Sequence, residues 1–243
     1  MILSGVRANS APGWSPARCS SCLSSVTNDL VSVAAAPSST TRLSYQPGAL
    51  PTVVVGDPSV AGGLTSVWTD DASSVRSALR YLAELGHRRV ARVAGLERLA
   101  HTAIRDEAFL AEANRLGLAG ELLRTDYTPH QGADVTRAAL QSAEPPTAFI
   151  YDNDVMAVAG LTVAHELGLE VPTDVSMIAW DDSVLCEHTL PSLTALSHDV
   201  VAFGSHVARR LFALIDGAEP GAFLDSTPSL RVRGSTGRVL ARG

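Results

Sequence analysis

Apolar runs alternate with amphipathic stretches along the chain from Pro51 onward, and Gly or Pro residues punctuate both. Short β-branched or apolar runs predict buried strands, whereas apolar residues recurring at helical spacing predict helices. An alternation of strands and helices is typical of an α/β fold with a parallel sheet. We expect strands at 52–56, 89–94, 148–151, 176–180 and 229–233, and a short extended segment at 193–196.

The expected helices lie between these strands. Asp70 or Asp71 can cap a helix that buries apolar residues spaced along one face and ends at Gly86. Further helices are expected at 102–116 and near 132–142, and two apolar faces with helical spacing predict two more. These faces are Met156, Leu161, Ala164 and Leu167, followed by Gly168, and Phe203, Val207, Leu211 and Leu214, followed by Gly217.

Residues 1–50 differ from the rest of the chain, because they are rich in Ser, Ala and Pro, contain no Glu and show no sustained period. Such a segment is expected to be poorly structured. It contains a C-x-x-C pair, Cys19 and Cys22, without a second pair or a nearby His. A zinc or redox role stays open as the less favoured interpretation. With Cys186 the chain has three cysteines, too few for a disulfide framework.

The charge and hydropathy of the chain narrow the classes of partner that it can bind. The formal net charge is −6, and all 19 basic residues are Arg. Because non-specific DNA binding depends on clustered basic side chains, this chain alone is not expected to hold DNA. No stretch approaches the roughly 20 apolar residues that span a bilayer, and residues 1–14 lack the apolar run of a secretory signal. We therefore expect no membrane partner and a cytoplasmic location.

Polar side chains follow several of the expected strands. Asp57 follows the first, Asn153 and Asp154 follow a later one, Asp181 and Asp182 follow another, and Arg105 lies one loop beyond the strand at 89–94. In open parallel sheets, ligands bind outside the carboxyl ends of the strands. Carboxylates, amides and a guanidinium suit a polyhydroxylated ligand such as a sugar or nucleoside, and an aromatic side chain such as Tyr127 could stack on its ring. The alternative is that these residues, Asp154 in particular, merely cap the next helix.

Several segments resemble motifs of LacI/GalR-type bacterial transcription regulators, in order and spacing, from about Pro51 to Thr236. The stretch Y-L-A-E-L-G-H-R-R-V resembles their L-x-x-L-G-H-R-R-I segment, and R-D-E-A-F resembles R-x-x-G-F with Ala108 in place of Gly. The block P-T-A-F-I-Y-D-N-D-V-M-A resembles P-T-A-x-x-x-x-N-D-x-M-A, and V-P-T-D-V-S-M-I-A-W-D-D resembles V-P-x-D-V-S-V-x-G-x-D-D. The shorter P-S-L-T and R-G-S-T resemble P-P-L-T-T and the terminal R-x-S-T.

This resemblance implies a periplasmic-binding-protein-like (type I) fold of two lobes with parallel sheets. The first lobe is expected to be incomplete and to comprise 51–69 and 198–218, and the second lobe 70–197 and 219–238. The chain is expected to cross between them near Thr69, Ser197 and Ala218. The helix-turn-helix headpiece and the opening strands of the family match nothing in residues 1–50, so a truncated chain is expected. Operator DNA would then be bound only through a headpiece that this chain lacks.

The resemblance also implies a function and a set of site residues. Regulators of this type bind a sugar or a related small effector in a cleft between the lobes, usually as homodimers, and cleft closure alters operator affinity. Where the motifs match, the ligand-binding positions fall on Asp57, Arg105, Asn153 and Asp181. Less firmly, an aromatic position falls on Tyr127 and a position often occupied by Gln falls on His198. Asp57 would belong to the first lobe and the remaining core positions to the second.

The sequence gives less support to other functions. An enzyme would need Asp181 and Asp182, or Asp152 and Asp154, as an acid–base pair, but adjacent residues after a strand usually point in different directions. No nucleophile elbow, phosphate loop, metalloprotease helix or dinucleotide motif is present in the sequence. We therefore expect no catalytic residue, cofactor or metal. An exported sugar receptor of the same fold, and an inert or merely dimer-forming remnant, stay as alternatives.

Overall fold

The computed structural model describes residues 50–239, in which the strands form two separate sheets. A six-stranded sheet has the order β4-β3-β5-β6-β7-β9, and a three-stranded sheet has the order β1-β2-β8. The segment expected to be poorly structured and the Cys19–Cys22 pair lie outside the described residues, apart from Leu50.

The six-stranded sheet is parallel except at its β9 edge, which pairs antiparallel with β7. Its strands are β3 (Arg89–Ala94), β4 (Ala119–Arg124), β5 (Ala148–Tyr151), β6 (Ser176–Trp180), β7 (Thr194–Ser197) and β9 (Ser229–Arg231). The expected α/β fold with parallel sheets is therefore confirmed.

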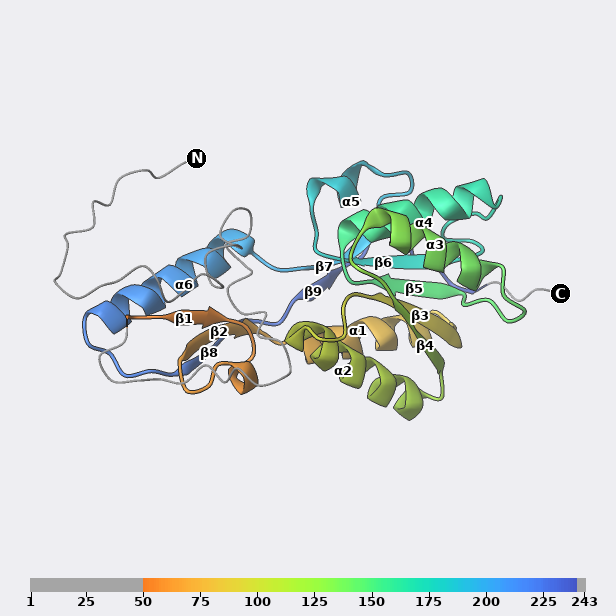
Figure 1. Ribbon diagram of the computed structural model, residues 1–243. Helices are drawn as coiled ribbons and strands as arrows, with labels where there is room; N and C mark the ends of the chain where they lie inside the picture. The colour runs from red at the N-terminus through yellow and green to blue at the C-terminus, as the bar shows by residue number, and fades with distance from the viewer. Residues whose placement is uncertain (1–49, 240–243) are drawn as a thin grey trace, which may run out of the picture. The chain divides into compact units, whose positions relative to one another are not determined.

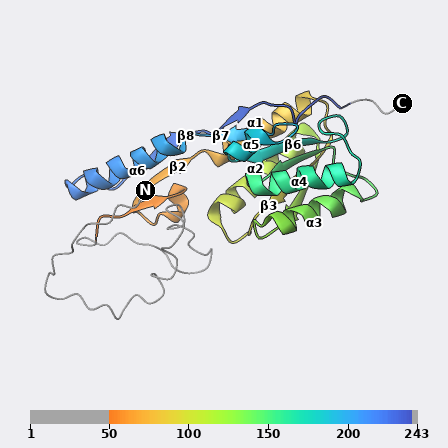
Figure 2. The same ribbon diagram turned by 90° about the horizontal axis from the view of Figure 1, so that it is seen from above.

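Helices cover both faces of this sheet (Figure 1). One face packs against α3 (Pro129–Leu140) and α4 (Asp154–Glu166), and the other packs against α1 (Asp71–Glu84) and α2 (Ala100–Leu116). Seen from above, α3 and α4 run side by side (Figure 2). Because successive side chains of a strand point to opposite faces, both faces of the central strands are apolar and buried.

Strand β5 shows how the two cores arise. Phe149 and Tyr151 lie in the core under α3 and α4, whereas Ala148 and Ile150 lie in the core under α1 and α2. All four side chains are fully buried. Fully burying a large apolar side chain stabilises a fold by roughly 1.5–3 kcal/mol, so the doubly covered strands form the most stable part of the lobe.

Side-chain caps start the helices where the sequence supplies an oxygen-bearing residue. Asp70, rather than Asp71, caps α1 by accepting a hydrogen bond from the Ser73 backbone N–H at 2.9 Å. At the carboxyl end of α2, Gly117 adopts a left-handed conformation with φ 66°, as its place after the last apolar residue predicts. A short helix, α5 (Val184–His188), follows β6 and was not expected from the pattern.

The His of the L-G-H-R-R segment has a structural role. His87 is buried between β5 and β6, with Nδ1 2.9 Å from the Thr147 hydroxyl and Nε2 3.1 Å from the Ser176 hydroxyl. Its Nε2 also lies 3.2 Å from the Gly237 carbonyl oxygen. Burial lowers the pKa of His87, with the Gly237 contact opposing that effect. His87 therefore links the amino ends of β5 and β6 to Gly237, near the end of the described residues.

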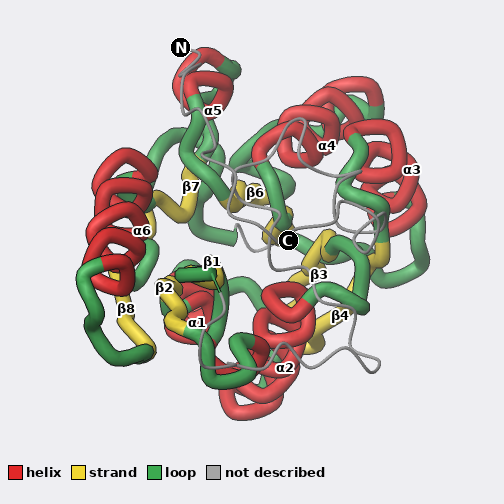
Figure 3. Tube along the Cα trace, turned by 60° about the vertical axis from the view of Figure 1, so that its left-hand side comes forward, coloured by secondary structure: helices red, strands yellow, loops and turns green. Residues whose placement is uncertain are grey.

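The three-stranded sheet contains β1 (Val53–Val55), β2 (Thr65–Thr69) and β8 (Ala222–Ser226), all parallel. Helix α6 (Val200–Ile215) lies beside this sheet (Figure 3). Because β8 pairs with β2, residues 222–226 belong to this sheet. The expected boundary had placed them in the second lobe. The chain enters the six-stranded sheet again between β8 and β9, later than the crossing expected near Ala218.

The apolar face expected for α6 is turned inward but only half covered. Phe203, Val207, Leu211 and Leu214 are half-buried, and no α6 residue is fully buried by the described part of the chain. None of the helices between residues 50 and 239 is long and apolar enough to cross a membrane.

Candidate functional site

Polar side chains meet at the carboxyl ends of β3, β5 and β6. Asp152 and Asn153 follow β5 directly, Asp181 follows β6, and Arg105 reaches the same place from α2. Three of the residues expected from the sequence, Arg105, Asn153 and Asp181, therefore lie after neighbouring strands of one sheet or on the helix that follows one. This edge is where open parallel sheets bind ligands.

The Arg105 guanidinium is held in one position by three contacts. Its Nε donates to Asp71 Oδ2 at 2.8 Å, its Nη1 lies 3.8 Å from Asp152 Oδ1, and its Cζ lies 3.5 Å from the centre of the Trp180 ring. Burial alone would lower the pKa of Arg105, but the carboxylates of Asp71, Asp152 and Asp181 raise it. Arg105 is thus a permanently charged planar group whose orientation is set in advance.

Asp152 is the buried partner of two guanidiniums. Arg92, in the middle of β3, donates from Nε and Nη2 to its carboxylate, and the Gly95 backbone N–H donates to Oδ2 at 3.0 Å. Burial raises the pKa of Asp152, but the charges of Arg92 and Arg105 outweigh that effect, so the pKa is lowered. Asp152 therefore stays ionised and positions the loop after β3.

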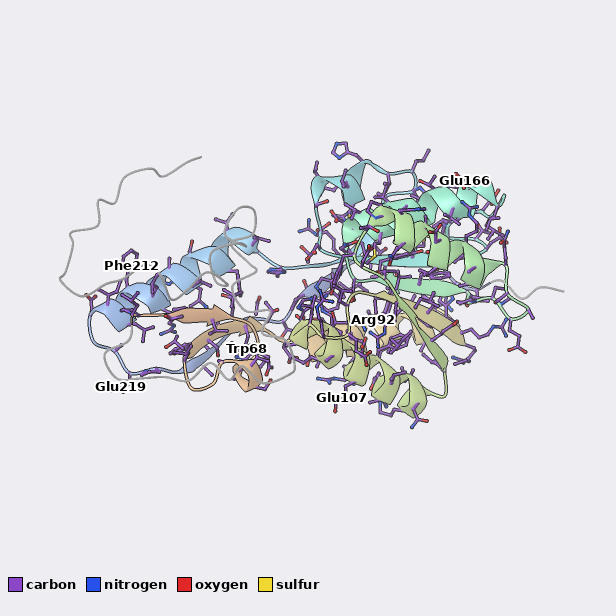
Figure 4. The ribbon with its side chains drawn as sticks, in the orientation of Figure 1. Trp68, Arg92, Glu107, Glu166, Phe212 and Glu219 are labelled. Atoms are coloured by element: carbon purple, nitrogen blue, oxygen red, sulfur yellow. The ribbon has the colours of Figure 1, made fainter. Side chains whose placement is uncertain are left out.

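Arg92 also contacts Asp106 on α2, and Arg124 Nη1 lies 2.6 Å from the other oxygen of the same carboxylate. Arg92 is fully buried and lies inside the lobe, where β3 faces α2 (Figure 4). The charged groups under the site thus form a connected network, and such a network holds its members in fixed geometry.

Tyr127 and Asn153 are linked to each other. The Tyr127 hydroxyl lies 2.7 Å from the Thr102 hydroxyl and 2.8 Å from His101 Nε2. Asn153 donates from Nδ2 to the Tyr127 carbonyl oxygen at 3.1 Å, and its Oδ1 accepts from the Met156 backbone N–H as the cap of α4. The helix-capping alternative therefore holds for Asn153 rather than for Asp154, yet its amide keeps one N–H and one lone pair for another partner.

Asp181 is exposed to solvent, so a ligand can reach it. Partial desolvation by the surrounding protein raises its pKa, the positive charges of Arg105 and His198 lower it, and the Asp154 carboxylate raises it further. Asp154 in turn accepts a hydrogen bond from the Ser183 hydroxyl. Asp181 thus lies within the electric field of the buried network while remaining accessible.

Two residues at this edge adopt backbone conformations that residues other than Gly rarely adopt. Tyr127 has φ 70° and Asp181 has φ 68°. They are the two non-glycine residues with positive φ among residues 50–239. Strained conformations of this kind cluster at ligand-binding sites, so these two outliers favour this edge as the candidate site independently of its charges.

The other two expected site residues have different surroundings. His198 is half-buried, with its ring edge-on to Phe203 at 5.9 Å. Asp57 follows β1 in the three-stranded sheet and caps a short 3-10 helix, Pro58–Val60, through the Ser59 backbone N–H at 2.9 Å. Among residues 50–239, no hydrogen bond or ion pair joins Asp57 to the Arg105 network.

Sequence reasoning missed Asp71 and Trp180 as partners of Arg105, and treated Asp152 only as a possible enzyme acid. One signal pointed to Asp152: Arg92 interrupts an apolar strand, and a buried guanidinium requires a carboxylate partner. The two acids considered as an enzyme pair have different partners, because Asp182 pairs with Arg233 at 2.7 Å, whereas the charge that most lowers the pKa of Asp181 is that of Arg105. Residues 50–239 contain no group of three His, Cys, Asp or Glu side chains that could hold a metal.

The sequence profile of the periplasmic binding protein-like domain matches residues 79–236, more than half of the 243-residue chain. The chain belongs to the periplasmic binding protein-like domain family. The resemblance to LacI/GalR-type regulators is also confirmed, because the relatives of this family member are regulators of that type rather than enzymes.

Two curated relatives illustrate this. The transcriptional regulator MalR of Streptomyces coelicolor is 33% identical over 69% of this chain and 50% of its own. The transcriptional repressor CytR of Escherichia coli is 30% identical over 71% of this chain and 52% of its own. This periplasmic binding protein-like chain therefore spans about half the length of the curated relatives that it matches.

Several solved structures similar to this chain are also of transcriptional regulators. A LacI family transcriptional regulator from Bifidobacterium animalis is 40% identical with a TM-score of 0.75, over 77% of this chain and 69% of its own. The regulator CelR, in complex with cellobiose, is 28% identical with a TM-score of 0.70, over 75% and 58%. A LacI family regulator from Enterococcus faecium with bound ribose is 26% identical with a TM-score of 0.70, over 78% and 72%.

Proposed function

We propose that this chain senses a sugar or a related small polar effector for a LacI-type transcription regulator. The ligand would bind at the carboxyl ends of β3, β5 and β6, and its binding would alter operator DNA affinity through a headpiece. The ligand-binding residues in this proposal are Asp57, Arg105, Tyr127, Asn153, Asp181 and His198.

The observation that carries the proposal is the arrangement of Arg105. Its Cζ lies 3.5 Å from the centre of the Trp180 ring, and its Nε donates to Asp71. Within residues 50–239, Nε is the one Arg105 nitrogen that donates a hydrogen bond to the protein, so the four N–H groups of Nη1 and Nη2 remain for a ligand. A planar fork held in advance loses little entropy when it binds two adjacent oxygens.

The neighbouring groups supply what else a polyol needs. The exposed Asp181 carboxylate accepts from hydroxyl groups, and the Asn153 amide can both donate and accept. The half-buried Tyr127 ring, tied down by its hydroxyl, offers an apolar surface for a sugar ring. His198, which acts on Asp181 when protonated, would lie at the margin of the site. Two solved relatives hold a sugar, which supports this class of ligand.

Regulation would follow from the position of Asp57. It belongs to the three-stranded sheet, whereas the other core positions belong to the six-stranded sheet. A ligand that contacts both groups stabilises one arrangement of the two sheets over another, and such coupling is typically worth about 1–3 kcal/mol. The acidic net charge of −6 fits DNA binding through another segment, and regulators of this type usually act as homodimers.

Thermal unfolding and titration calorimetry of the full chain with ribose, galactose, glucose and cellobiose test the proposal. A bound sugar at about 100 times its Kd stabilises the fold by about 2.7 kcal/mol, which raises the Tm by about 5–10 °C for a domain of this size. No Tm shift with any sugar, together with no heat of binding, would overturn the proposed function.

Two variants locate the site. Arg105→Lys keeps the positive charge beside Asp71 but loses the planar fork, so sugar affinity is expected to fall by at least about tenfold. Arg115→Ala removes an exposed guanidinium from the same helix and is expected to leave sugar affinity unchanged. Full binding by Arg105→Lys would place the site elsewhere.

A further inference from the structure

We infer that the ligand of this site is an uncharged polyhydroxylated molecule, and that the site rejects sugar acids and sugar phosphates of the same shape. This inference rests on the proposed function and adds the charge class of the ligand. An arginine at a strand end usually suggests an anionic ligand, and the surroundings of Arg105 lead to the opposite conclusion.

The positive charge of Arg105 is already balanced within the protein. Asp71 lies 2.8 Å from its Nε and Asp152 lies 3.8 Å from its Nη1. The Asp181 carboxylate acts on the same guanidinium. A ligand that reaches the free N–H groups therefore finds strong hydrogen-bond donors without a net positive field.

The other guanidiniums nearby are also committed. Arg92 is fully buried between Asp152 and Asp106, and Arg124 pairs with Asp106. Around the site, three guanidiniums (Arg92, Arg105 and Arg124) interact with four carboxylates (Asp71, Asp106, Asp152 and Asp181), and a fifth carboxylate, Asp154, acts on Asp181. The three positive and five negative charges leave an excess of two carboxylates.

Few other groups can supply positive charge here. The chain contains no Lys. His101 hydrogen-bonds the Tyr127 hydroxyl, and burial, followed by the charge of Arg105, lowers its pKa, so it is neutral near pH 7. His198, when protonated, acts on the Asp181 carboxylate. An anionic ligand would therefore have no uncommitted cation to meet.

An uncharged polyol avoids this difficulty. Its hydroxyl groups can donate to the Asp181 carboxylate and accept from the Arg105 N–H groups at the same time. A carboxylate or phosphate on the ligand could accept from Arg105 only while approaching Asp181 and Asp154. One like charge about 4 Å away lowers an affinity by about fivefold in water, and by more where water is excluded.

The experiment compares matched pairs of sugars by titration calorimetry at pH 7 on the full chain. The pairs are ribose with ribose 5-phosphate, glucose with glucuronate, galactose with galacturonate, and cellobiose with cellobionate. We expect each neutral sugar that binds to do so at least about fivefold more tightly than its anionic partner.

The Asp181→Asn variant tests the cause. Asn keeps an oxygen acceptor and tolerates positive φ, so the ratio of neutral to anionic affinity is expected to fall by at least about fivefold while the fold is retained. Glu107→Gln is the matched control, because it removes an exposed carboxylate on the outer side of α2 and should leave the ratio unchanged (Figure 4).

The outcomes separate the two ideas. An anionic sugar that binds as tightly as its neutral partner would overturn this inference while the proposed function stands. An unchanged ratio in Asp181→Asn would equally overturn it, because the carboxylate excess would not be the cause. No binding by any member of any pair would overturn the proposed function, and the inference with it.

Discussion

The Arg92 guanidinium and the Asp152 carboxylate form a bidentate pair in the interior, with Nη2 2.7 Å from both carboxylate oxygens. Neither side chain is exposed. The pair joins the middle of β3 to the loop that follows β5, and Asp152 also faces Arg105. Because one carboxylate serves both residues, the core of the lobe and the orientation of the candidate site depend on the same contact.

Replacing Arg92 by Leu is therefore expected to destabilise the fold by about 3–5 kcal/mol, because Asp152 and Asp106 would be left buried without their main partner. Urea unfolding at pH 7 measures the loss. Combining Arg92→Leu with Asp106→Asn and Asp152→Asn removes the unpaired charges and should recover part of it. A loss below about 1 kcal/mol in Arg92→Leu would show that water reaches these carboxylates.

Gly95 leaves room for the Tyr127 ring. A Cβ at position 95 would lie 1.8 Å from Tyr127 Cζ, so Gly95→Ala must push the ring away from Thr102. We expect Gly95→Ala to destabilise by about 1–3 kcal/mol and to weaken sugar binding. The double variant Gly95→Ala with Tyr127→Ala should be no less stable than Tyr127→Ala alone, because the clash is gone, and should still bind sugar weakly, as thermal unfolding and calorimetry would separately report.

The central strands could be predicted from the sequence with the bounds that the structure has. Residues 148–151 and 176–180 are buried throughout and appear as short, mostly apolar runs, whereas residues 89–94 are predicted from the alternation of apolar residues with Arg. The edge strand β4 could not be predicted from the sequence, because it is partly exposed and contains Gly120. A Cβ there would lie 2.9 Å from Ala113 Cβ, so the Gly that obscures the strand pattern lets α2 pack closely.

The candidate site could be predicted only in part. Residues directly after a buried strand converge at one edge by topology, so the sequence predicts the positions of Asn153 and Asp181. Their individual partners depend on tertiary contacts that no local pattern contains. Asp71 begins α1, 34 positions before Arg105, and local spacing gives no sign that it holds this guanidinium.

His87 should make stability depend on pH near neutrality. Burial lowers its pKa in the folded state from the ordinary value of 6.5. In the unfolded chain the imidazole therefore takes up a proton at a higher pH than in the folded protein. Its stabilising contribution is complete above pH 6.5 and is lost as the pH falls from there through the folded-state pKa. The urea midpoint of His87→Gln should fall less steeply below pH 6.5 than that of the natural chain, whereas the exposed His188→Gln should follow the natural chain.

Glu112 should control stability at acid pH. Hydrogen bonds from Arg115 lower its pKa to about 2, burial opposes this, and Arg80 lowers it further. Because the folded-state pKa lies below the ordinary value of 4.5, the stabilisation is complete above pH 4.5 and is lost as the pH falls toward 2. Glu112→Gln should therefore cost about 2 kcal/mol at pH 7 and little near pH 2. Guanidinium unfolding at several pH values measures this difference, with the exposed Glu107→Gln as control. An equal cost at pH 7 and pH 2 would mean that the side chain acts through its packing and not through its charge.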